Sequence, residues 1–296
     1  MAIIRKKCYS LHMNSPFLSI ITINYNNAEG LRKTLESVKN QTSKNYEHII
    51  IDGGSNDKSV DVIKDFLADK QYAENIAHWC SEKDNGIYDA MNKGIAYANG
   101  KYCLFLNSGD YLADNDVINR FSSYNLTEEL IYTNAICFNS EKEWIVSYPY
   151  PITLAHFYYG KTLNHQNALI KTSIQKEHLY SLDFKILSDR EFFMHCIQKD
   201  ASQRFINTDI ISKYENETGL STIYIDKIKE EKKQLDNIYF SKAIQNSFNY
   251  LMAYKNELDI YENCYHGLLK KIRKLCLMYT KLKYSFRKTR LDSMHE

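Results

Sequence analysis

The sequence lacks several features that would assign it to common classes of protein. Its seven cysteines include no CxxC pair and no metal-type spacing, which is typical of reduced core thiols in a cytoplasmic protein. No run approaches the roughly 18 apolar residues of a membrane span. The apolar segment near the first residue is too short for a secretory signal. Neither a GxxxxGK(S/T) loop nor a GxGxxG loop is present, which excludes the usual phosphate-binding loops.

The totals that remain bound the size and the charge of the molecule. A length of 296 residues allows one large domain, or one domain with an extension, and 44% hydrophobic residues can fill a core. The net charge of +2 is close to balanced, and no nucleic-acid-binding motif is found. Nucleic acid is therefore not an expected partner.

Strands and helices alternate through the first hundred residues. Uninterrupted apolar runs predict strands, and apolar residues spaced three or four apart predict helices between them. Strands are expected at 17–24, 46–51, 76–80 and 102–106, with helices near 31–38, 59–67 and 87–99. This order predicts an α/β fold with a doubly wound, mostly parallel sheet.

Each predicted strand ends on polar or acidic side chains. These are Thr22, Asn24, Asp52, Glu82, Asp84, Asn107 and Asp110. Because the carboxyl ends of parallel strands meet at one edge, where ligands of open α/β sheets bind, these groups should gather there. Gathered carboxylates repel one another unless a cation or hydrogen-bond donors join them. A nucleotide supplies such donors and a divalent ion supplies charge, so the pattern predicts a nucleotide site, with a metal or a basic group on the phosphates.

Four motifs between residues 17 and 112 resemble those of glycosyltransferase family 2, which has the GT-A fold. They are Ser19-Ile-Ile-Thr-Ile-Asn-Tyr-Asn-Asn27, Ile51-Asp-Gly-Gly-Ser-Asn-Asp57, Asp84-Asn-Gly-Ile-Tyr-Asp-Ala-Met-Asn-Lys-Gly94 and Phe105-Leu-Asn-Ser-Gly-Asp110. The chain is similar to bacterial members that build O-antigen and other surface polysaccharides. The resemblance implies a nucleotide-sugar donor, most often UDP-linked, bound by Thr22, Asn24, Asp52, Asp84 and Asn107.

The resemblance also implies a divalent cation, Mn²⁺ or Mg²⁺, at Asp110. Here the sequence departs from the family, whose usual motif is Asp-X-Asp-Asp, because Gly109 stands where the main metal-binding aspartate belongs. One carboxylate with diphosphate oxygens and waters can still hold Mg²⁺, and oxygen ligands suit Mn²⁺ equally. The alternative is that Asp110 only caps the following segment.

A second group of candidate residues lies between 151 and 200. Inverting sugar transfer needs a base for the acceptor hydroxyl, and Asp189 stands where the family usually carries it. Ser188 or Asp189 could instead be the N-cap of the helix that opens there. His165 is a candidate contact for a phosphate or the acceptor, or a structural histidine. Arg190 could steady the leaving diphosphate or form a surface pair.

A GT-A-like domain is expected over 1–221, with a nucleotide half at about 17–112 and an acceptor half at about 113–221. The remainder, 222–296, is expected to form a helical basic tail, with nine Lys or Arg and no acid from 270 to 290. Apolar residues from Leu251 to Phe286 alternate by three and four, which fits a coiled-coil dimer seam, a helix packed on the domain, or a basic amphipathic helix (268–290) on an anionic membrane.

These observations predict an inverting glycosyltransferase that moves a hexose or an N-acetylhexosamine to a saccharide acceptor, lipid-linked, in surface polysaccharide synthesis. The expected location is cytoplasmic, peripheral to the inner face of the plasma membrane. Two alternatives remain: a nucleotidyltransferase, which would need a basic glycine-rich loop after its first strand, and a catalytically silent sugar-nucleotide-binding module, which the glycine at 109 would suit.

Overall fold

The computed structural model describes residues 15–215, 224–259, 267–268, 270–271 and 274. The chain forms two compact units, Met1–Tyr239 and Phe240–Glu296. The boundary expected near residue 221 lies outside the described residues. Helix α10 (Ile225–Tyr239), which the sequence assigns to the tail, belongs to the first unit.

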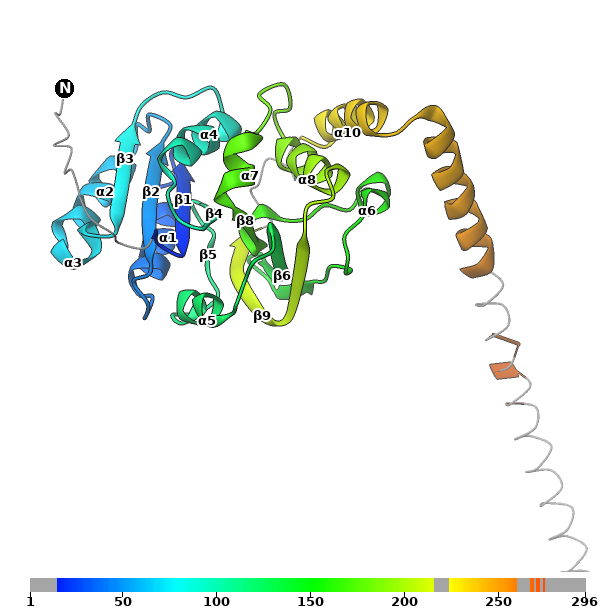
Figure 1. Cartoon of the computed structure of the whole chain (residues 1–296), viewed down its shortest axis with the longest axis horizontal. Coiled ribbons are helices and arrows are strands. Elements are labelled where there is room, and N and C mark those ends of the chain that lie inside the picture. The colour runs from blue at the N-terminus through cyan, green and yellow to red at the C-terminus, as the bar shows by residue number, and fades with distance from the viewer. Residues whose placement is uncertain (1–14, 216–223, 260–266, 269, 272–273, 275–296) are drawn as a thin grey trace, which may run out of the picture. The chain divides into compact units, whose positions relative to one another are not determined.

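The first four strands form the parallel block that the sequence predicts (Figure 1). They are β1 (Leu18–Asn24), β2 (Tyr46–Asp52), β3 (Ile76–Ser81) and β4 (Tyr102–Asn107), in the spatial order β3-β2-β1-β4. The connecting helices are α1 (Ala28–Lys39), α2 (Ser59–Ala68), α3 (Lys70–Ala73) and α4 (Ile87–Tyr97). Every residue of β1 is buried, including the polar Ser19, Thr22 and Asn24, as expected for a strand covered on both faces.

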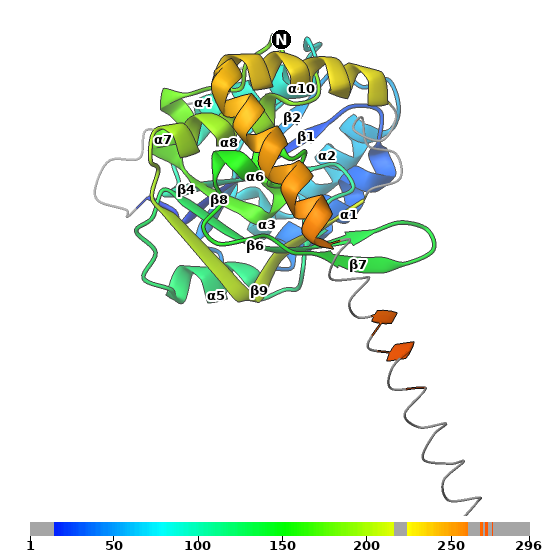
Figure 2. The same cartoon turned by 90° about the vertical axis from the view of Figure 1, so that its right-hand side faces the viewer.

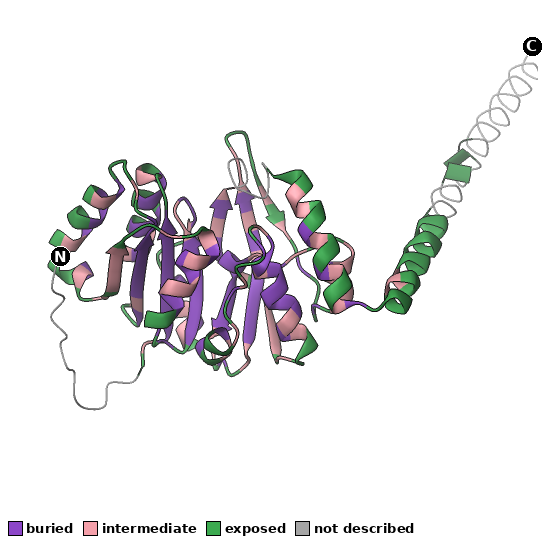
Figure 3. Ribbon diagram, turned by 90° about the horizontal axis from the view of Figure 1, so that it is seen from above, coloured by how far each residue is buried: buried purple, intermediate pink, exposed green. Residues whose placement is uncertain are grey.

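Helices cover both faces of this block, so the doubly wound arrangement is confirmed. Ile20 of β1 lies in a core cluster that includes Leu31 of α1 and Ile63 of α2. Its neighbour Ile21 points to the opposite face and meets α4 at Gly94, where a Cβ would lie 2.4 Å from the Ile21 side chain. Figure 3 shows the buried strands between helices whose outer surfaces are exposed.

The same sheet continues into the second half of the unit. Beyond β4 lie β8 (Ala168–Lys171), β6 (Leu130–Phe138), β9 (Gln203–Glu215) and β5 (Tyr111–Leu112), and β7 (Glu143–Val146) pairs with β6. β8 runs antiparallel to both β4 and β6, whereas β9 runs parallel to β6. The sheet is therefore mixed in this half.

The helical segments of the second half are short. They are α5 (Val117–Ser123), α6 (Leu154–Tyr158), η1 (His165–Asn167), α7 (Thr172–Glu177) and α8 (Ser188–Gln198). α6 packs against α8 (Figure 2). The helix expected to open at Ser188 is confirmed as α8.

The second unit is described over a shorter range. Residues 242–259 are helical, and the expected seam residues Leu251, Tyr254 and Leu258 are exposed there. Most of the basic segment 268–290 lies outside the described residues. No described helix is both long enough and apolar enough to cross a membrane. Across the described part of the chain, the cysteines Cys80, Cys103, Cys137 and Cys196 are free thiols.

Candidate active site

The strand register brings several of the predicted polar residues to one edge of the sheet. Asn24 at the end of β1 stands opposite Asp52 at the end of β2, and Asp52 stands opposite Ser81 of β3. On the other side of β1, Ile23 is the partner of Asn107 at the end of β4. The carboxyl ends of these strands therefore form one polar edge, as the sequence predicts.

Asp52 is fully buried at this edge and its carboxylate accepts several hydrogen bonds. The donors are the Asn24 amide at 2.7 Å, the Ser55 backbone N–H at 2.9 Å, and the hydroxyls of Ser55 and Ser81, each at 2.6 Å. Burial raises the pKa of Asp52, but these bonds outweigh it and hold the pKa below its ordinary value. The residue is therefore an anionic acceptor at neutral pH.

Asp84 lies directly beside the Asp52 loop. A Cβ built on Gly53 would fall 2.4 Å from the Asp84 carboxylate, so with any other residue at position 53 the Asp84 side chain would have to move from this position. Asp84 also accepts a hydrogen bond from the backbone N–H of Gly86 at 2.9 Å. The structure thus places the Asp84 carboxylate against Gly53, the residue that follows Asp52.

Thr22 lies inside the sheet rather than at its edge. Its side chain is fully buried, and its hydroxyl lies 2.9 Å from Nε2 of His48, whose Nδ1 lies 2.6 Å from the hydroxyl of Tyr72. Burial lowers the pKa of His48 to about 3, so this ring is neutral. Thr22 therefore has a partner within the core, and Asn24 is the residue of β1 that reaches the edge.

The turn after β4 is held by the start of α1. The Gly109 backbone N–H donates to the Thr34 hydroxyl at 3.0 Å, and that hydroxyl lies 2.7 Å from the carbonyl oxygen of Asp110. The Asn27 amide donates to the carbonyl of Ser108 at 3.0 Å. Gly109 has a φ of +108°, a conformation that favours glycine, so the turn itself requires the residue that departs from the family motif.

Asp110 is buried, with 6% of its surface exposed. Its carboxylate accepts hydrogen bonds from the Gln166 amide at 3.0 Å and from the Asn107 backbone N–H at 3.2 Å. Burial raises the pKa of Asp110 to about 6, although His165 and these hydrogen bonds lower it in part. An acid whose ionised form lacks full compensation suits a cation, because a nearby positive charge would favour ionisation.

The residues around Asp110 fit a divalent cation. Oδ1 of Asn107 is buried and has no hydrogen-bond partner among the described residues, although buried amide oxygens usually have one. Carboxylate and amide oxygens are the ligands that Mg²⁺ and Mn²⁺ prefer. The donor set of Asp110 and Asn107 therefore matches the cation that the resemblance implies.

His165 links this turn to Asp189. Its Nδ1 lies 3.1 Å from a carboxylate oxygen of Asp189, and its Nε2 lies 3.3 Å from the amide nitrogen of Asn107. With Asn107 in the orientation that gives this contact, Nε2 accepts and Nδ1–H donates to Asp189. The Tyr88 hydroxyl lies 3.1 Å from the other carboxylate oxygen. The structure therefore joins Asn107, His165 and Asp189 in one chain of contacts.

The loop that precedes Asp189 is anchored by a side chain of α10. Residue Leu187 is the N-cap of α8, so neither Ser188 nor Asp189 caps this helix. The loop before it is tied instead to Glu231 of α10, which is fully buried and accepts the backbone N–H groups of Lys185, Ile186 and Leu187 at 2.8, 3.0 and 2.9 Å. The sequence analysis gave no role to Glu231, Tyr88 or Gln166: no motif includes Glu231 or Gln166, and Tyr88 lies inside the third motif without a function assigned to it.

The side chain of Arg190 is directed at α6. It is 3% exposed, and its guanidinium donates to the carbonyl of Phe157 in α6. Burial lowers the pKa of Arg190, and the charges of Asp236 and Asp189 offset this in part. Its hydrogen bond to Phe157 joins α8 to α6, and among the described contacts it does not bond to Asn107, Asp110 or His165.

Among the described residues, His178, Glu191 and His195 also bring metal-type ligand atoms within 4.8 Å of one another. The two imidazoles stack at 3.7 Å with only 3° between their planes, and Glu191 bonds to His178 at 3.1 Å and to the Tyr239 hydroxyl at 2.5 Å. Parallel rings cannot direct their lone pairs at one ion, so this group is a stacked, hydrogen-bonded contact.

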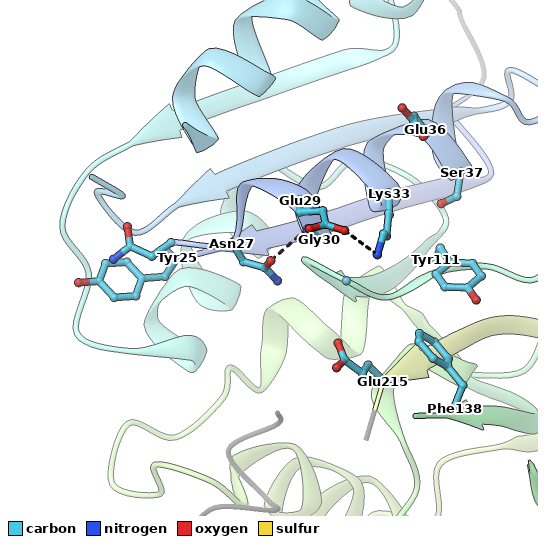
Figure 4. A pocket seen from close by; sticks show the side chains of 12 residues that line it. Tyr25, Asn27, Glu29, Gly30, Lys33, Glu36, Ser37, Tyr111, Phe138 and Glu215 are labelled. Carbon is cyan, nitrogen blue, oxygen red and sulfur yellow. Dashed lines mark hydrogen bonds and ion pairs between the residues drawn. The ribbon is translucent and has the colours of Figure 1, made fainter. Parts of the chain in front are cut away.

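A cavity of about 890 Å³ opens beside Gly109 (Figure 4). Residues that line it come from the β1–α1 loop, α1, β5 and the end of β9, and include Tyr25, Asn27, Lys33, Tyr111 and Glu215. Asp52, Asp84 and Asp189 do not line it. The cavity therefore adjoins the turn on the α1 side, next to the polar edge.

Comparisons with known proteins point to one family of enzymes. The family model described as glycosyl transferase family 2 matches residues 19–184. An uncharacterized glycosyltransferase of Mycobacterium tuberculosis is 35% identical over 193 residues, which covers 61% of this chain and 69% of that protein. A PGL/p-HBAD biosynthesis glycosyltransferase of Mycobacterium bovis is 27% identical over 219 residues, covering 73% of this chain and 83% of that protein.

Solved structures share the fold. Residues 1–349 of TarS from S. aureus, in complex with UDP-GlcNAc, give a TM-score of 0.57 at 14% identity, covering 78% of this chain and 70% of that one. The chain spans 42% of a longer TarS structure. A mannosyltransferase from Pyrobaculum calidifontis, in complex with GDP-Man and Mn²⁺, gives a TM-score of 0.54 at 13% identity, covering 83% of this chain and 73% of that one. Because the family model matches more than half of the length of this chain, the chain belongs to glycosyltransferase family 2 and is a glycosyltransferase.

Proposed function

We propose that this enzyme transfers a hexose or an N-acetylhexosamine, with inversion, from a UDP-linked donor to a lipid-linked saccharide acceptor in surface polysaccharide synthesis. The observation that carries the proposal is the contact chain from Asn107 through His165 to Asp189. It joins the turn suited to a cation and a diphosphate to the carboxylate suited to the acceptor.

The nucleoside is proposed to lie over Asn24, Asp52 and Asp84. The carboxylate of Asp84 is partly exposed and can accept hydrogen bonds from ribose hydroxyls or a base N–H. Asp52 is ionised but fully buried and already accepts four hydrogen bonds, so it would contribute its negative charge and the position of its loop. The TarS structure in complex with UDP-GlcNAc has the same fold, which supports a UDP-sugar as the donor.

Asp110 and Asn107 would hold the divalent cation, which when bound supplies positive charge to the leaving diphosphate. The mannosyltransferase with the same fold was solved with Mn²⁺, which supports a cation here. The protein's own contribution is a rigid turn, because Thr34 and Asn27 fix the backbone of residues 108–110 from α1. A turn fixed in advance costs no reorganisation when the donor binds.

Asp189 is proposed as the general base. Its carboxylate takes the proton of the acceptor hydroxyl while that oxygen bonds to the anomeric carbon, and the bond from this carbon to the diphosphate breaks, releasing the nucleoside diphosphate. His165 and Tyr88 hold the two carboxylate oxygens in position. The Asp189 side chain keeps 15% of its surface exposed, so a hydroxyl can reach it.

The names of two relatives support the acceptor class. One is a PGL/p-HBAD biosynthesis glycosyltransferase of Mycobacterium bovis. Another, from Methanococcus voltae, is named as a glucuronosyltransferase that acts on a dolichyl N-acetyl-α-D-glucosaminyl phosphate; it is 31% identical over 216 residues, covering 67% of this chain and 66% of that protein. A sugar carried on a lipid phosphate is accordingly our proposed acceptor.

The basic segment 268–290 is proposed to contact the anionic inner face of the plasma membrane, where lipid-linked acceptors would be met. Nine basic residues without an acid attract anionic lipid, at about 1 kcal/mol for each residue near the surface. Deletion of 268–296 should release the protein from vesicles that contain phosphatidylglycerol and leave UDP affinity unchanged. If the deletion variant and the full chain bind such vesicles equally, the membrane contact is disproved. If the full chain sediments as a dimer and the deletion variant as a monomer, a helical dimer seam is favoured instead.

The donor is tested by thermal shift with a panel of nucleotide sugars, followed by measurement of nucleoside diphosphate release with and without EDTA. A donor present at 100 times its Kd should stabilise the protein by about 2.7 kcal/mol. Asp52→Asn should abolish the shift, whereas Asp61→Asn, on the exposed side of α2, should not. If no nucleotide sugar stabilises the wild type, the proposed donor class is wrong.

A further inference from the structure

We propose that Glu215, the last residue of β9, supplies the second carboxylate of the cation site, in place of the side chain that Gly109 lacks. This inference rests on the proposed function, because it concerns the same cation. Nothing in the family motif points to Glu215, which lies 105 positions after Asp110 in the sequence.

The register of the sheet brings Glu215 to the turn. β5 and β9 run antiparallel, with Tyr111 opposite Lys213 and Leu112 opposite Ser212. Two residues further along the same register, Glu215 stands opposite Gly109. Side chains on a strand repeat every second residue, so Glu215 shares the face of Lys213.

The space in front of Gly109 is open except for this carboxylate and one amide. A Cβ built on Gly109 would have only two contacts within 4 Å, Oε2 of Glu215 and Nδ2 of Asn27, each at 3.8 Å. The carboxylate of Glu215 therefore lies where a side chain at position 109 would project. An aspartate at 109 would be strained at a φ of +108°, whereas a carboxylate from β9 reaches the same space without strain.

A second contact fixes Glu215 to the same turn. Its backbone N–H donates a hydrogen bond to the carboxylate of Asp110. The end of β9 and the cation-binding turn are thus tied together by the main chain, so the Glu215 side chain starts beside Asp110. Oxygen donors from Asn107, Asp110 and Glu215 come from two segments, the end of β4 with the turn after it and the end of β9, and carboxylate and amide oxygens are the ligands that a hard cation takes.

The cavity beside Gly109 opens onto the Glu215 side of this site, whereas Asn107 and Asp110 do not line it. Glu215 lines the cavity of about 890 Å³, together with Lys33 and Tyr25 (Figure 4). Mg²⁺ and Mn²⁺ keep waters and bind substrate phosphates in addition to protein oxygens, so a site needs such an opening. A diphosphate in the cavity mouth would complete the coordination.

The test measures Mn²⁺ binding to the full chain by electron paramagnetic resonance, with and without UDP. Glu215→Gln keeps size and hydrogen bonding but removes the charge. It should weaken Mn²⁺ binding at least ~10-fold, because even outer-shell partners of metal ligands change affinity about 10–100-fold. Glu36→Gln, the matched control, changes an exposed carboxylate on α1 that lines the same cavity, and should alter affinity by less than twofold.

Glu215→Asp provides a second variant, because it keeps the charge but shortens the side chain by one methylene. Its Mn²⁺ affinity should lie between those of the wild type and Glu215→Gln. Mn²⁺ affinity of Glu215→Gln equal to that of the wild type would disprove the inference. Absence of Mn²⁺ binding by the wild type would disprove it together with the cation assignment. UDP-sugar binding measured in EDTA tests the donor separately, so failure of the inference leaves the proposed transferase reaction open to its own test.

Discussion

Glu231 should be essential to the active site although it lies in the segment that the sequence assigns to the tail. Its buried carboxylate accepts three backbone N–H groups from residues 185–187, immediately before α8 and Asp189. Replacement by glutamine would put an NH₂ group where an oxygen accepts the N–H of Lys185. That N–H would lose its acceptor, and the other two bonds would lose their charge.

The size of the effect follows from these three bonds. A buried donor left unsatisfied costs about 1–3 kcal/mol, and hydrogen bonds to charged groups contribute about 1 kcal/mol more than neutral ones. Glu231→Gln should therefore lower the free energy of unfolding by roughly 3–5 kcal/mol, a large part of the ~5–15 kcal/mol typical of a domain. Below the unfolding transition, kcat should fall because Asp189 shifts, whereas the Kd of the nucleotide should not change.

The assay compares Glu231→Gln with Glu230→Gln by urea unfolding, transfer kinetics and UDP titration. Glu230 is the exposed neighbour on α10, paired with Lys227 at 3.0 Å, and its loss should cost less than about 0.5 kcal/mol. Equal stability and equal kcat for the two variants would refute the positioning role of α10. Weaker UDP binding by Glu231→Gln would show that the loop acts on the donor side instead.

Three further predictions concern the site itself. Asp189→Asn should lower kcat by about 10²–10⁴-fold, as expected for a lost general base, with UDP affinity unchanged by calorimetry; transfer within tenfold of the wild type would remove Asp189 as the base. Because the pKa of Asp110 is raised from 3.8 to about 6, its protonated form is favoured by folding: the stability that this group contributes in metal-free protein is complete below pH 3.8 and is lost as the pH rises through 6. Asp110→Asn should therefore be more stable than the wild type in EDTA at pH 8, by up to about 3 kcal/mol, and equally stable near pH 4; a difference independent of pH would contradict this. Thr22→Val should destabilise the protein by about 1–3 kcal/mol, because Nε2 of the buried His48 loses its partner, and leave UDP affinity unchanged; weaker UDP binding in a folded variant would show that Thr22 acts in the nucleotide site.

Much of the site could be predicted because it depends on strand ends. A buried parallel strand ends at the carboxyl edge of the sheet, so a polar residue directly after an apolar run is expected to lie at that edge. Asn24, Asp52 and Asn107 are predicted in this way, and the register confirms that they lie at neighbouring strand ends. Thr22 shows the limit: it shares a face of β1 with Asn24, but it lies two residues before the end of the strand and is fully buried there.

The sequence by itself determined the parallel β-α block and the edge at which its polar residues meet, because apolar periodicity and strand ends are local properties, and its four motifs carried the resemblance to the family. Only the tertiary structure decided which side chains touch across long separations: His165 with Asp189, Gln166 with Asp110, and Glu231 with the loop before α8. It also decided that Arg190 turns to Phe157. These contacts depend on which element lies beside which and on the rotamer each side chain then adopts, and neither is encoded in the spacing of residues along one helix or strand.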